Sequence, residues 1–194
     1  LEKTGQLSKV GRDLLDQKVV KVFSSLDDIA ERSGDLKKEA GKKIGEVLGG
    51  IDDLVQSAEK AGLPKDVLKE HFQFSMKKVG DRIKSEIVEA NANNPLLKTE
   101  MNKLLSIADD FSQGGTVSLK DANIIKGTQG KVTKFASDTM PQAFQKEVYS
   151  IIKEEIDNAV GNVGIALEKS GVQGASGLKG IYDSAKSQYG SFAQ

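Results

Sequence analysis

This chain is short of the residues on which most catalytic and metal-binding sites depend. Among its 194 residues there are no cysteines, no tryptophans and one histidine, His71. The absence of cysteine excludes disulfides, thiolate zinc sites and a cysteine nucleophile. A lone histidine on a helix is usually a surface or hydrogen-bonded residue, and no phosphate-binding loop motif occurs. We therefore expect no catalytic residue, no cofactor, no metal ion and no small-molecule ligand.

An excess of charge and long apolar runs are also missing. Lysine plus arginine and aspartate plus glutamate each number 28, so the formal net charge is zero. A neutral chain without a basic block gives no reason to expect a nucleic-acid partner. No apolar run approaches the roughly 20 residues of a membrane span, and no signal peptide is evident. Because helical patterning starts almost at Leu1, we expect a fragment of a longer chain or a processed product.

Apolar residues recur at alternating spacings of three and four along most of the sequence, which is typical of amphipathic helices. The clearest stretch carries Ala40, Ile44, Val47, Ile51, Leu54, Ala58 and Ala61. No segment alternates with period two over the length of a strand. We predict an all-α fold of about six or seven long amphipathic helices without a sheet. Short turns would join them in antiparallel hairpins, as a bundle or an extended array with coiled-coil-like packing.

Turn signals place the predicted helix ends and divide the chain in two. Residues 1–115 are expected to form a four-helix region. Its first helix, over about 6–32, ends at Ser33-Gly34-Asp35, and its second ends at Gly62-Leu63-Pro64. The third and fourth helices are expected over 64–91 and 97–111. Residues 116–194 are expected to form a helical hairpin, over about 118–135 and 141–167, followed by a frayed C-terminal helix.

Three glycines lie on one side of the second helix, beside its apolar stripe. They are Gly41, Gly45 and Gly49, at a constant spacing of four. A glycine inside a helix costs about 1 kcal/mol relative to alanine, so three of them need an explanation. The functional interpretation is a smooth face that another helix approaches closely. The alternative is a weak helix that packing alone maintains, or a break at Gly49-Gly50.

Paired acidic residues are the remaining candidates for chemistry. They are Asp27-Asp28, Asp52-Asp53, Asp109-Asp110 and Glu154-Glu155. Adjacent residues on a helix point about 100° apart, and no Glu-x-x-His motif of the kind used in helical-bundle metal sites occurs. We attribute these pairs to solvated faces. Burial alone can raise the pKa of a glutamate, so Glu147, Glu154 and Glu155 are the residues to alter in a test for wall-cleaving activity.

Three stretches of the C-terminal region share a helical pattern, SLKDANIIK (118–126), EVYSIIKEEI (147–156) and GLKGIYDSAKSQY (177–189). In these stretches the region resembles a helical module that recurs in large virion proteins of tailed bacteriophages and prophages. Similar modules occur in tape-measure-like proteins and in ejected internal proteins. The resemblance covers residues 116–194 only, and Gly127 and Gly130 depart from the continuous first helix of such modules. It implies a structural role in the virion and carries over no active-site residue.

The leading hypothesis is a non-enzymatic structural or assembly segment of a phage or prophage virion protein. It would work through helix–helix contacts with other virion subunits or with copies of itself, and its location would be the virion. The alternatives are a bacterial helical interaction protein, secreted or on the cell surface, and a membrane-surface protein. The last fits less well, because the polar faces mix both signs of charge whereas interfacial helices are rich in lysine and arginine. An enzyme is the least favoured class.

Overall fold

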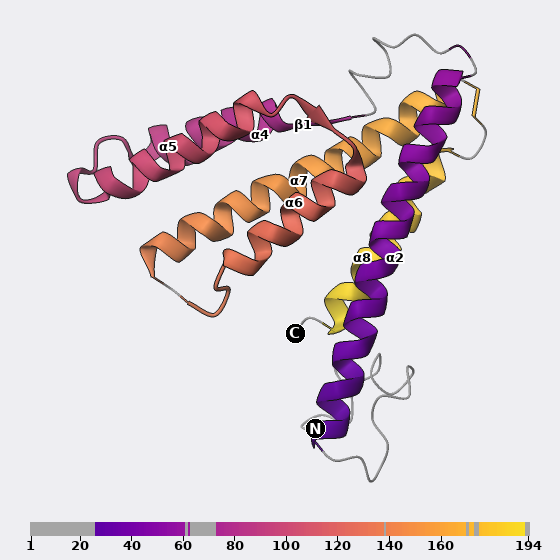
Figure 1. The fold of residues 1–194 in the computed structure, drawn as a ribbon, viewed down its shortest axis with the longest axis horizontal. Coiled ribbons are helices and arrows are strands. Elements are labelled where there is room, and N and C mark those ends of the chain that lie inside the picture. Colours follow the sequence, from indigo (N-terminus) through magenta and orange to yellow (C-terminus); the bar gives the residue numbers. More distant parts are fainter. Residues whose placement is uncertain are drawn as a thin grey trace, which may run out of the picture. The chain divides into compact units, whose positions relative to one another are not determined.

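Residues 26–60, 62, 73–137, 139–169, 171–172 and 175–192 are described in this computed structural model, and the statements below concern these residues. The fold is mostly helical, as predicted (Figure 1). The α-helices are α2 (Leu26–Lys60), α4 (Met76–Arg82), α5 (Lys98–Gln113), α6 (Leu119–Val132), α7 (Met140–Lys169) and α8 (Leu178–Phe192). Shorter helical turns are η1 (Ile83–Val88), η2 (Glu89–Asn91), η3 (Pro95–Leu97) and η4 (Ala175–Gly177).

The prediction of a chain without any sheet is wrong at one small place. β1 (Phe74–Ser75) pairs antiparallel with β2 (Thr116–Val117), with Phe74 opposite Val117. Two-residue strands are too short to produce a period-two pattern, so periodicity could not reveal them. Phe74 and Ser75 lie within the helix predicted over 64–91, so that prediction is wrong at these two residues, and its part over 64–72 lies outside the described residues. α4 begins at Met76, and the Ser75 side chain accepts a hydrogen bond from the Lys78 backbone N–H.

Contacts along the chain form two compact units. Unit 1 is Leu1–Leu48 with Lys179–Gln194, and unit 2 is Gly49–Leu178. The predicted division into 1–115 and 116–194 groups the helices differently and stays a prediction about domains. Each unit is described by itself below.

The described part of unit 1 consists of the first part of α2 and most of α8, which lie side by side (Figure 1). The ammonium of Lys37 lies 5.7 Å from the centre of the Tyr189 ring, an attractive cation–π geometry. The buried apolar side chains of this unit are Ala40, Ile44, Leu48, Tyr182 and Ala185. A helix in the glycine- and serine-rich C-terminal stretch is confirmed, but the prediction that it is frayed is wrong, because Tyr182 and Ala185 are buried.

The predicted break at Ser33-Gly34-Asp35 is wrong, because α2 runs without interruption from Leu26 to Lys60. The predicted first helix otherwise falls largely on residues 1–25, outside the described residues. One helical glycine costs about 1 kcal/mol, and burial of the apolar stripe that follows outweighs that cost. The predicted end of α2 is confirmed, since Gly62 has a φ of 98°, the left-handed conformation that glycine adopts readily.

Unit 2 contains two helical hairpins. The first hairpin runs from α4 through η1 and η2 to α5, and the second consists of α6 and α7 (Figure 1). Its buried side chains follow the predicted apolar stripes on α4, η1 and α5, including Val79, Ile83, Ile87, Met101, Leu104 and Ala108. Among the described helices, none is long and apolar enough to span a bilayer.

Gly80 lets the two arms of the first hairpin approach each other closely. A methyl group at this position would lie 2.5 Å from the Ala108 carbonyl oxygen and 2.3 Å from the Ser112 hydroxyl. Both distances are shorter than van der Waals contact, so α4 and α5 pack here because residue 80 has no side chain. The sequence predicts close approach of two helices at Gly41, Gly45 and Gly49. Such a close approach is observed at a different glycine, Gly80.

The second hairpin begins where the capping signals predicted it. Ser118 accepts a hydrogen bond from the Asp121 backbone N–H, and α6 starts at Leu119. α6 is continuous through Gly127 and Gly130, and it ends at Val132 rather than at the predicted Phe135. A methyl group at Gly130 would lie 3.2 Å from the Tyr149 ring of α7, which explains a small residue there.

Candidate functional site

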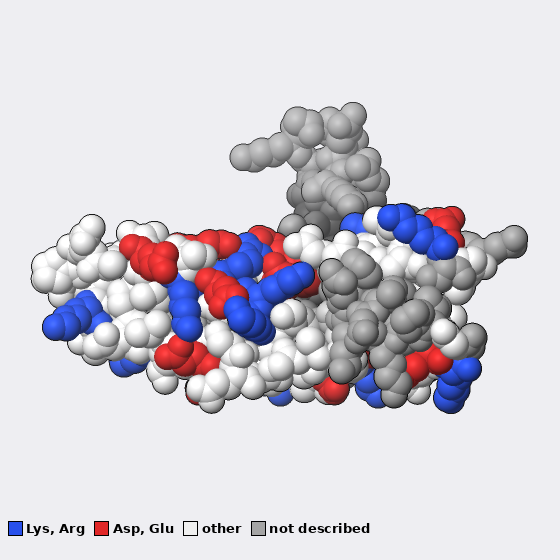
Figure 2. Space-filling view, turned by 90° about the horizontal axis from the view of Figure 1, so that it is seen from above, with Lys and Arg blue, Asp and Glu red and all other residues white. Residues whose placement is uncertain are grey.

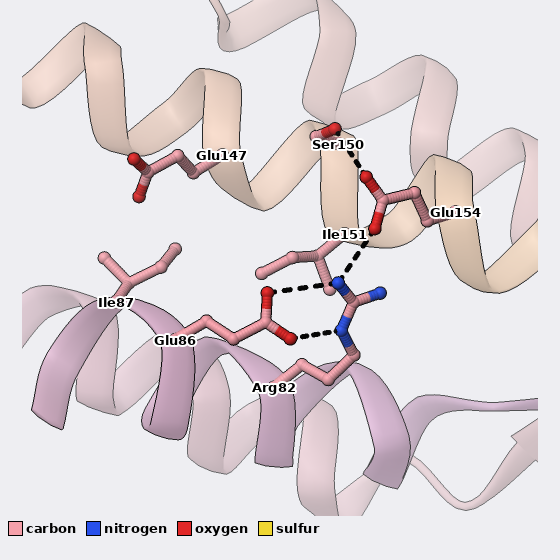
Figure 3. A pocket seen from close by; sticks show the side chains of 7 residues that line it. All are labelled: Arg82, Glu86, Ile87, Glu147, Ser150, Ile151 and Glu154. Atoms are coloured by element: carbon pink, nitrogen blue, oxygen red, sulfur yellow. Dashed lines mark hydrogen bonds and ion pairs between the residues drawn. The ribbon is translucent and has the colours of Figure 1, made fainter. Parts of the chain in front are cut away.

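A pocket of about 310 Å³ lies between the first hairpin and α7, inside unit 2 (Figure 3). The first hairpin and α7 each contribute charged groups and one isoleucine, so the pocket has a polar part and an apolar part. The lining residues are Arg82, Glu86 and Ile87 on the first hairpin and Glu147, Ser150, Ile151 and Glu154 on α7.

Helix geometry explains why these residues share one space. Residues three or four positions apart on a helix lie on the same face. Glu147, Ser150 or Ile151, and Glu154 follow that spacing on α7, and Arg82 and Glu86 follow it on the first hairpin. The two segments run antiparallel, because Arg82 binds Glu154 while Ile87, farther along, shares the pocket with Glu147.

The first hairpin carries a local irregularity beside the pocket. Residues Ile83–Val88 form a π-helical turn, in which the Glu89 backbone N–H donates to the Lys84 carbonyl oxygen five residues earlier. Such turns are rare, and they often occur at functional sites. Here the turn keeps Ile83 and Ile87 buried while Glu86 lines the pocket.

Arg82 is the centre of the charge network (Figure 3). Its Nε and Nη2 donate to the two carboxylate oxygens of Glu86 at 2.6 and 3.0 Å. Nη2 also donates to Glu154 at 2.8 Å, and Nη1 donates to Glu155 at 3.0 Å. These bonds, of which the one to Glu86 has the largest effect, raise the pKa of the guanidinium above its already high value. One arginine thus joins the first hairpin to α7 through two glutamates on α7.

The pKa values of two carboxyl groups in the pocket are shifted in opposite directions. Partial desolvation and, secondarily, the charge of Glu86 raise the pKa of Glu147. The hydrogen bond from Arg82, with a smaller contribution from the Ser150 hydroxyl, lowers the pKa of Glu154. When the pKa values of two acids in one site are shifted in opposite directions, one can stay protonated as a proton donor while the other stays ionised. The pocket therefore holds one carboxyl that protonates more readily than the other.

Metal binding finds no support within the described residues. They contain no group of three or more histidine, cysteine, aspartate or glutamate side chains placed to hold an ion. Glu86, Glu154 and Glu155 already accept hydrogen bonds from Arg82. His71 lies outside the described residues.

The acidic pairs attributed to solvent make contacts between elements in three cases among the described residues, and in the first of them Asp109 pairs with Lys84 across the first hairpin at 2.7 Å. Glu154 and Glu155 both bind Arg82, so this pair is only partly a solvated face. Asp52 accepts hydrogen bonds from the Leu119 and Lys120 backbone N–H groups, each at 3.0 Å. Sequence reasoning missed Arg82, although its spacing of four from Glu86 is a recognisable helical ion-pair signal.

The glycine face predicted on α2 is not tested as a whole. A methyl group at Gly41 would lie 3.6 Å from the Tyr189 ring, an ordinary contact distance. At Gly45 and Gly49 a methyl group would meet no atom within 4 Å among the described residues. Close helix approach along all three glycines stays a prediction.

Taken together, the fold and the pocket define a helical protein whose charged groups join its helices. Comparison of the chain with protein-family models, with curated proteins and with solved structures finds no match.

Proposed function

We propose that this chain is a non-enzymatic structural or assembly segment that works through helix–helix contacts with other proteins. The observation that carries the proposal is that its best-placed polar groups join helices to one another. Arg82 connects the first hairpin to α7, and Asp52 connects α2 to the start of α6. A molecule whose long helices are joined by such hydrogen bonds and ion pairs suits a mechanical or scaffolding role. The exposed surfaces of long helices can also pack against helices of other proteins.

A place in a phage or prophage virion is the more specific part of the proposal. It is supported by the resemblance of residues 116–194 to helical modules of large virion proteins. It is compatible with the long helices of the fold, since α2 has 35 residues and α7 has 30. Such lengths are two to three times the mean for globular proteins.

Purified particles test this proposal directly. Virions from the strain that encodes the chain are isolated on a density gradient, and peptides of α2 and α7 are quantified by mass spectrometry. We expect a reproducible copy number per particle that survives a high-salt wash. Absence of the chain from washed particles would contradict a virion location.

Site-specific photo-cross-linking tests the helix–helix contact. A photoreactive residue at Ile165, which is 54 % exposed on α7, probes an apolar surface position. Glu168, exposed on the same helix, is the matched polar control position. We expect Ile165 to cross-link to another virion protein or to a second copy, and more strongly than Glu168. Failure of both positions to cross-link within particles would count against helix–helix contact through α7.

A second candidate function is hydrolysis of a glycan, which the opposite pKa shifts of Glu147 and Glu154 favour. Glycoside hydrolases use a protonated acid and an ionised carboxylate across the scissile bond. The two glutamates are seven residues apart on α7, about 10 Å along the helix axis. The engagement of Glu154 by Arg82 weighs against this candidate, because a carboxylate in an ion pair is a poor base or nucleophile.

Loss of turbidity of purified cell walls distinguishes the two functions. The parent chain is compared with Glu147→Gln and Glu154→Gln, and Glu168→Gln serves as a matched control outside the pocket. We expect no sustained clearing by any of them. Clearing by the parent that only Glu147→Gln and Glu154→Gln abolish would establish the enzymatic function and overturn the structural proposal.

A further inference from the structure

The turns of both hairpins lie at the same end of unit 2. Arg82 lies against Glu154, whereas Ile87, one turn farther out, lies beside Glu147 on α7. Beyond Ile87, the chain continues to the turn of the first hairpin. From Glu147, α7 runs in the opposite chain direction back to its start, next to the turn of the second hairpin. Figure 1 shows both turns at the end away from β1. We call residues 92–98 and 131–140 the distal end.

The distal end exposes four large apolar side chains. Leu96 is 91 % exposed, Val132 57 %, Phe135 52 % and Met140 53 %. Single exposed apolar residues need no explanation, but these four lie on the two turns at one end of the unit, one on the first turn and three on or beside the second. In Figure 2 the left end of the molecule shows uncharged surface with a basic side chain near its tip, and acidic side chains lie farther toward the middle.

Polar contacts and one ring contact hold the second turn together. The Gln129 side chain donates to Gln145 at 2.6 Å, and the Lys134 backbone N–H donates to Gln142 at 2.6 Å. The buried Thr133 hydroxyl donates to the Gln129 carbonyl oxygen. The Phe135 ring packs edge-on against Tyr149, with 5.1 Å between ring centres. The turn is thus held in place from within, with Val132 and Phe135 half exposed.

The charge of the distal end differs from that of the whole chain. Counted from the sequence, residues 92–98 and 131–140 contain three lysines, Lys98, Lys131 and Lys134, and one acidic residue, Asp138, which gives +2 against zero for the chain; Asp138 lies outside the described residues. The three lysines are exposed. Lys131 and Lys134 each precede an exposed apolar residue, Val132 and Phe135. The acids nearest to the first turn in the sequence are Glu89 and Glu100, and Glu100 binds Lys103.

We propose that the distal end binds the surface of an anionic lipid bilayer. The four apolar side chains enter the interfacial layer, and the three lysines contact lipid phosphates. Apolar side chains flanked by lysines suit an anionic interface. A bilayer accepts protruding side chains from two separate turns without matching their shape, whereas a protein partner would need a complementary hollow. The binding is end-on, so the mixed charges of the helix faces do not oppose it.

Flotation of the full chain with lipid vesicles tests the proposal. Vesicles of phosphatidylcholine alone are compared with vesicles of equal parts phosphatidylcholine and phosphatidylglycerol. The parent should float with the anionic vesicles and much less with the neutral ones. Val132→Ser, Phe135→Ser and Met140→Ser combined should lower the fraction bound about tenfold, because the apolar transfer is lost. Lys131→Gln with Lys134→Gln should remove most of the preference for anionic lipid.

Exposed apolar residues elsewhere provide the matched control. Ile124→Ser, Ile165→Ser and Ile181→Ser combined remove three exposed apolar side chains from α6, α7 and α8 and should leave flotation unchanged. Circular dichroism checks that every variant keeps the parent fold. No flotation of the parent, or equal loss in the control, overturns the proposal. Self-association that the serine variants at the distal end abolish, without flotation of the parent, would assign that end to a protein contact instead.

Discussion

Arg82 shows how much of unit 2 depends on a single side chain. A guanidinium offers five N–H donors in a planar fork, and this one reaches three carboxylates on two segments. Because Arg82 is mostly buried while Glu154 is about half exposed, water screens part of the attraction. The contribution of Glu154 is lost as the pH falls through its lowered pKa, since protonation removes the ionised partner.

Substitution of Gly80 by alanine is expected to destabilise unit 2. The new methyl group would meet the Ala108 carbonyl oxygen at 2.5 Å and the Ser112 backbone nitrogen at 2.9 Å. Backbone atoms of a packed helix do not move cheaply, so the free energy of unfolding should fall by about 1–3 kcal/mol. Gly127→Ala is the control, because its methyl group meets nothing within 4 Å and should stabilise α6 by up to about 1 kcal/mol. Urea titrations measure both, and parental stability of Gly80→Ala would contradict the close packing.

Substitution of Glu147 by glutamine is expected to change the pH dependence of stability. The pKa of Glu147 is raised by desolvation and by Glu86, so its ionisation opposes folding above that pKa. That penalty disappears as the pH falls below the ordinary pKa of glutamate, about 4.3. Glu147→Gln should therefore stabilise the chain at neutral pH and have no effect near pH 4.

The effect should stay below about 1 kcal/mol, because Glu147 is an exposed residue and solvent screens its charge. Urea titrations at both pH values measure it, with Glu168→Gln as the control of equal charge change. A gain that is the same at both pH values would contradict the assigned cause.

At the scale of helices and strands, the periodicity of apolar residues predicts which helices exist better than it predicts where they begin and end. The stripes on α2, α5 and α7 contain many of the buried residues, because tertiary packing follows the same 3.6-residue period. The α2 stripe is wrong at Leu54, which is 38 % exposed, and it omits Leu48, which is buried. The predicted helix end at Gly34 is wrong because one glycine is weak evidence for a helix end when neither a proline nor a shift in the apolar repeat accompanies it. The π turn at Ile83–Val88 and the β1–β2 pair have no sequence signature of their own.

At the start of α6, the backbone N–H groups of the first four helical residues, from Leu119 to Ala122, all have an acceptor. A helix leaves its first four N–H groups without partners inside the helix. Here Asp52 accepts from Leu119 and Lys120, the Ser118 side chain accepts from Asp121, and the Ser118 carbonyl oxygen accepts from Ala122. The cap by Ser118 is local and could be predicted, whereas Asp52 is 67 residues away from Leu119 and could not.

Replacement of Asp52 by alanine is expected to cost about 1–2 kcal/mol of stability, the range for loss of a helix cap. The reason is that two backbone donors at the start of α6 lose their acceptor. Asp53→Ala removes the same charge from an exposed neighbouring position and should change stability by less than about 0.5 kcal/mol. Hydrogen exchange should quicken at the Leu119 and Lys120 amides in Asp52→Ala only. Unchanged protection of these amides would contradict the tie between α2 and α6.

At the scale of the whole molecule, sequence patterns identified the all-helical class but not the site. Glu147, Glu154 and Glu155 were singled out as acids, yet the pocket forms only because the first hairpin folds against α7. That contact joins residues more than 70 positions apart, Arg82 with Glu154 and Glu155. No periodicity predicts which helix faces meet, because every apolar stripe can pack on every other.

Two alternative fragments decide between the domain division predicted from the sequence and the units of the structure. Residues 49–178 contain both hairpins, the pocket, Asp52 and its partners on α6, and most of the buried side chains. We expect this fragment to be helical and to unfold in one cooperative thermal transition, as single domains of this size do.

Residues 116–194 retain α6, α7 and α8 but lose α4, α5, Arg82 and Asp52. The buried face of α7 would then be open to water, so this second fragment should melt broadly and without cooperativity. Circular dichroism during heating, with calorimetry to compare the two enthalpies of unfolding, measures both. A sharp transition in 116–194 together with none in 49–178 would favour the division near residue 115 and show that the contact between the first hairpin and α7 contributes little to folding.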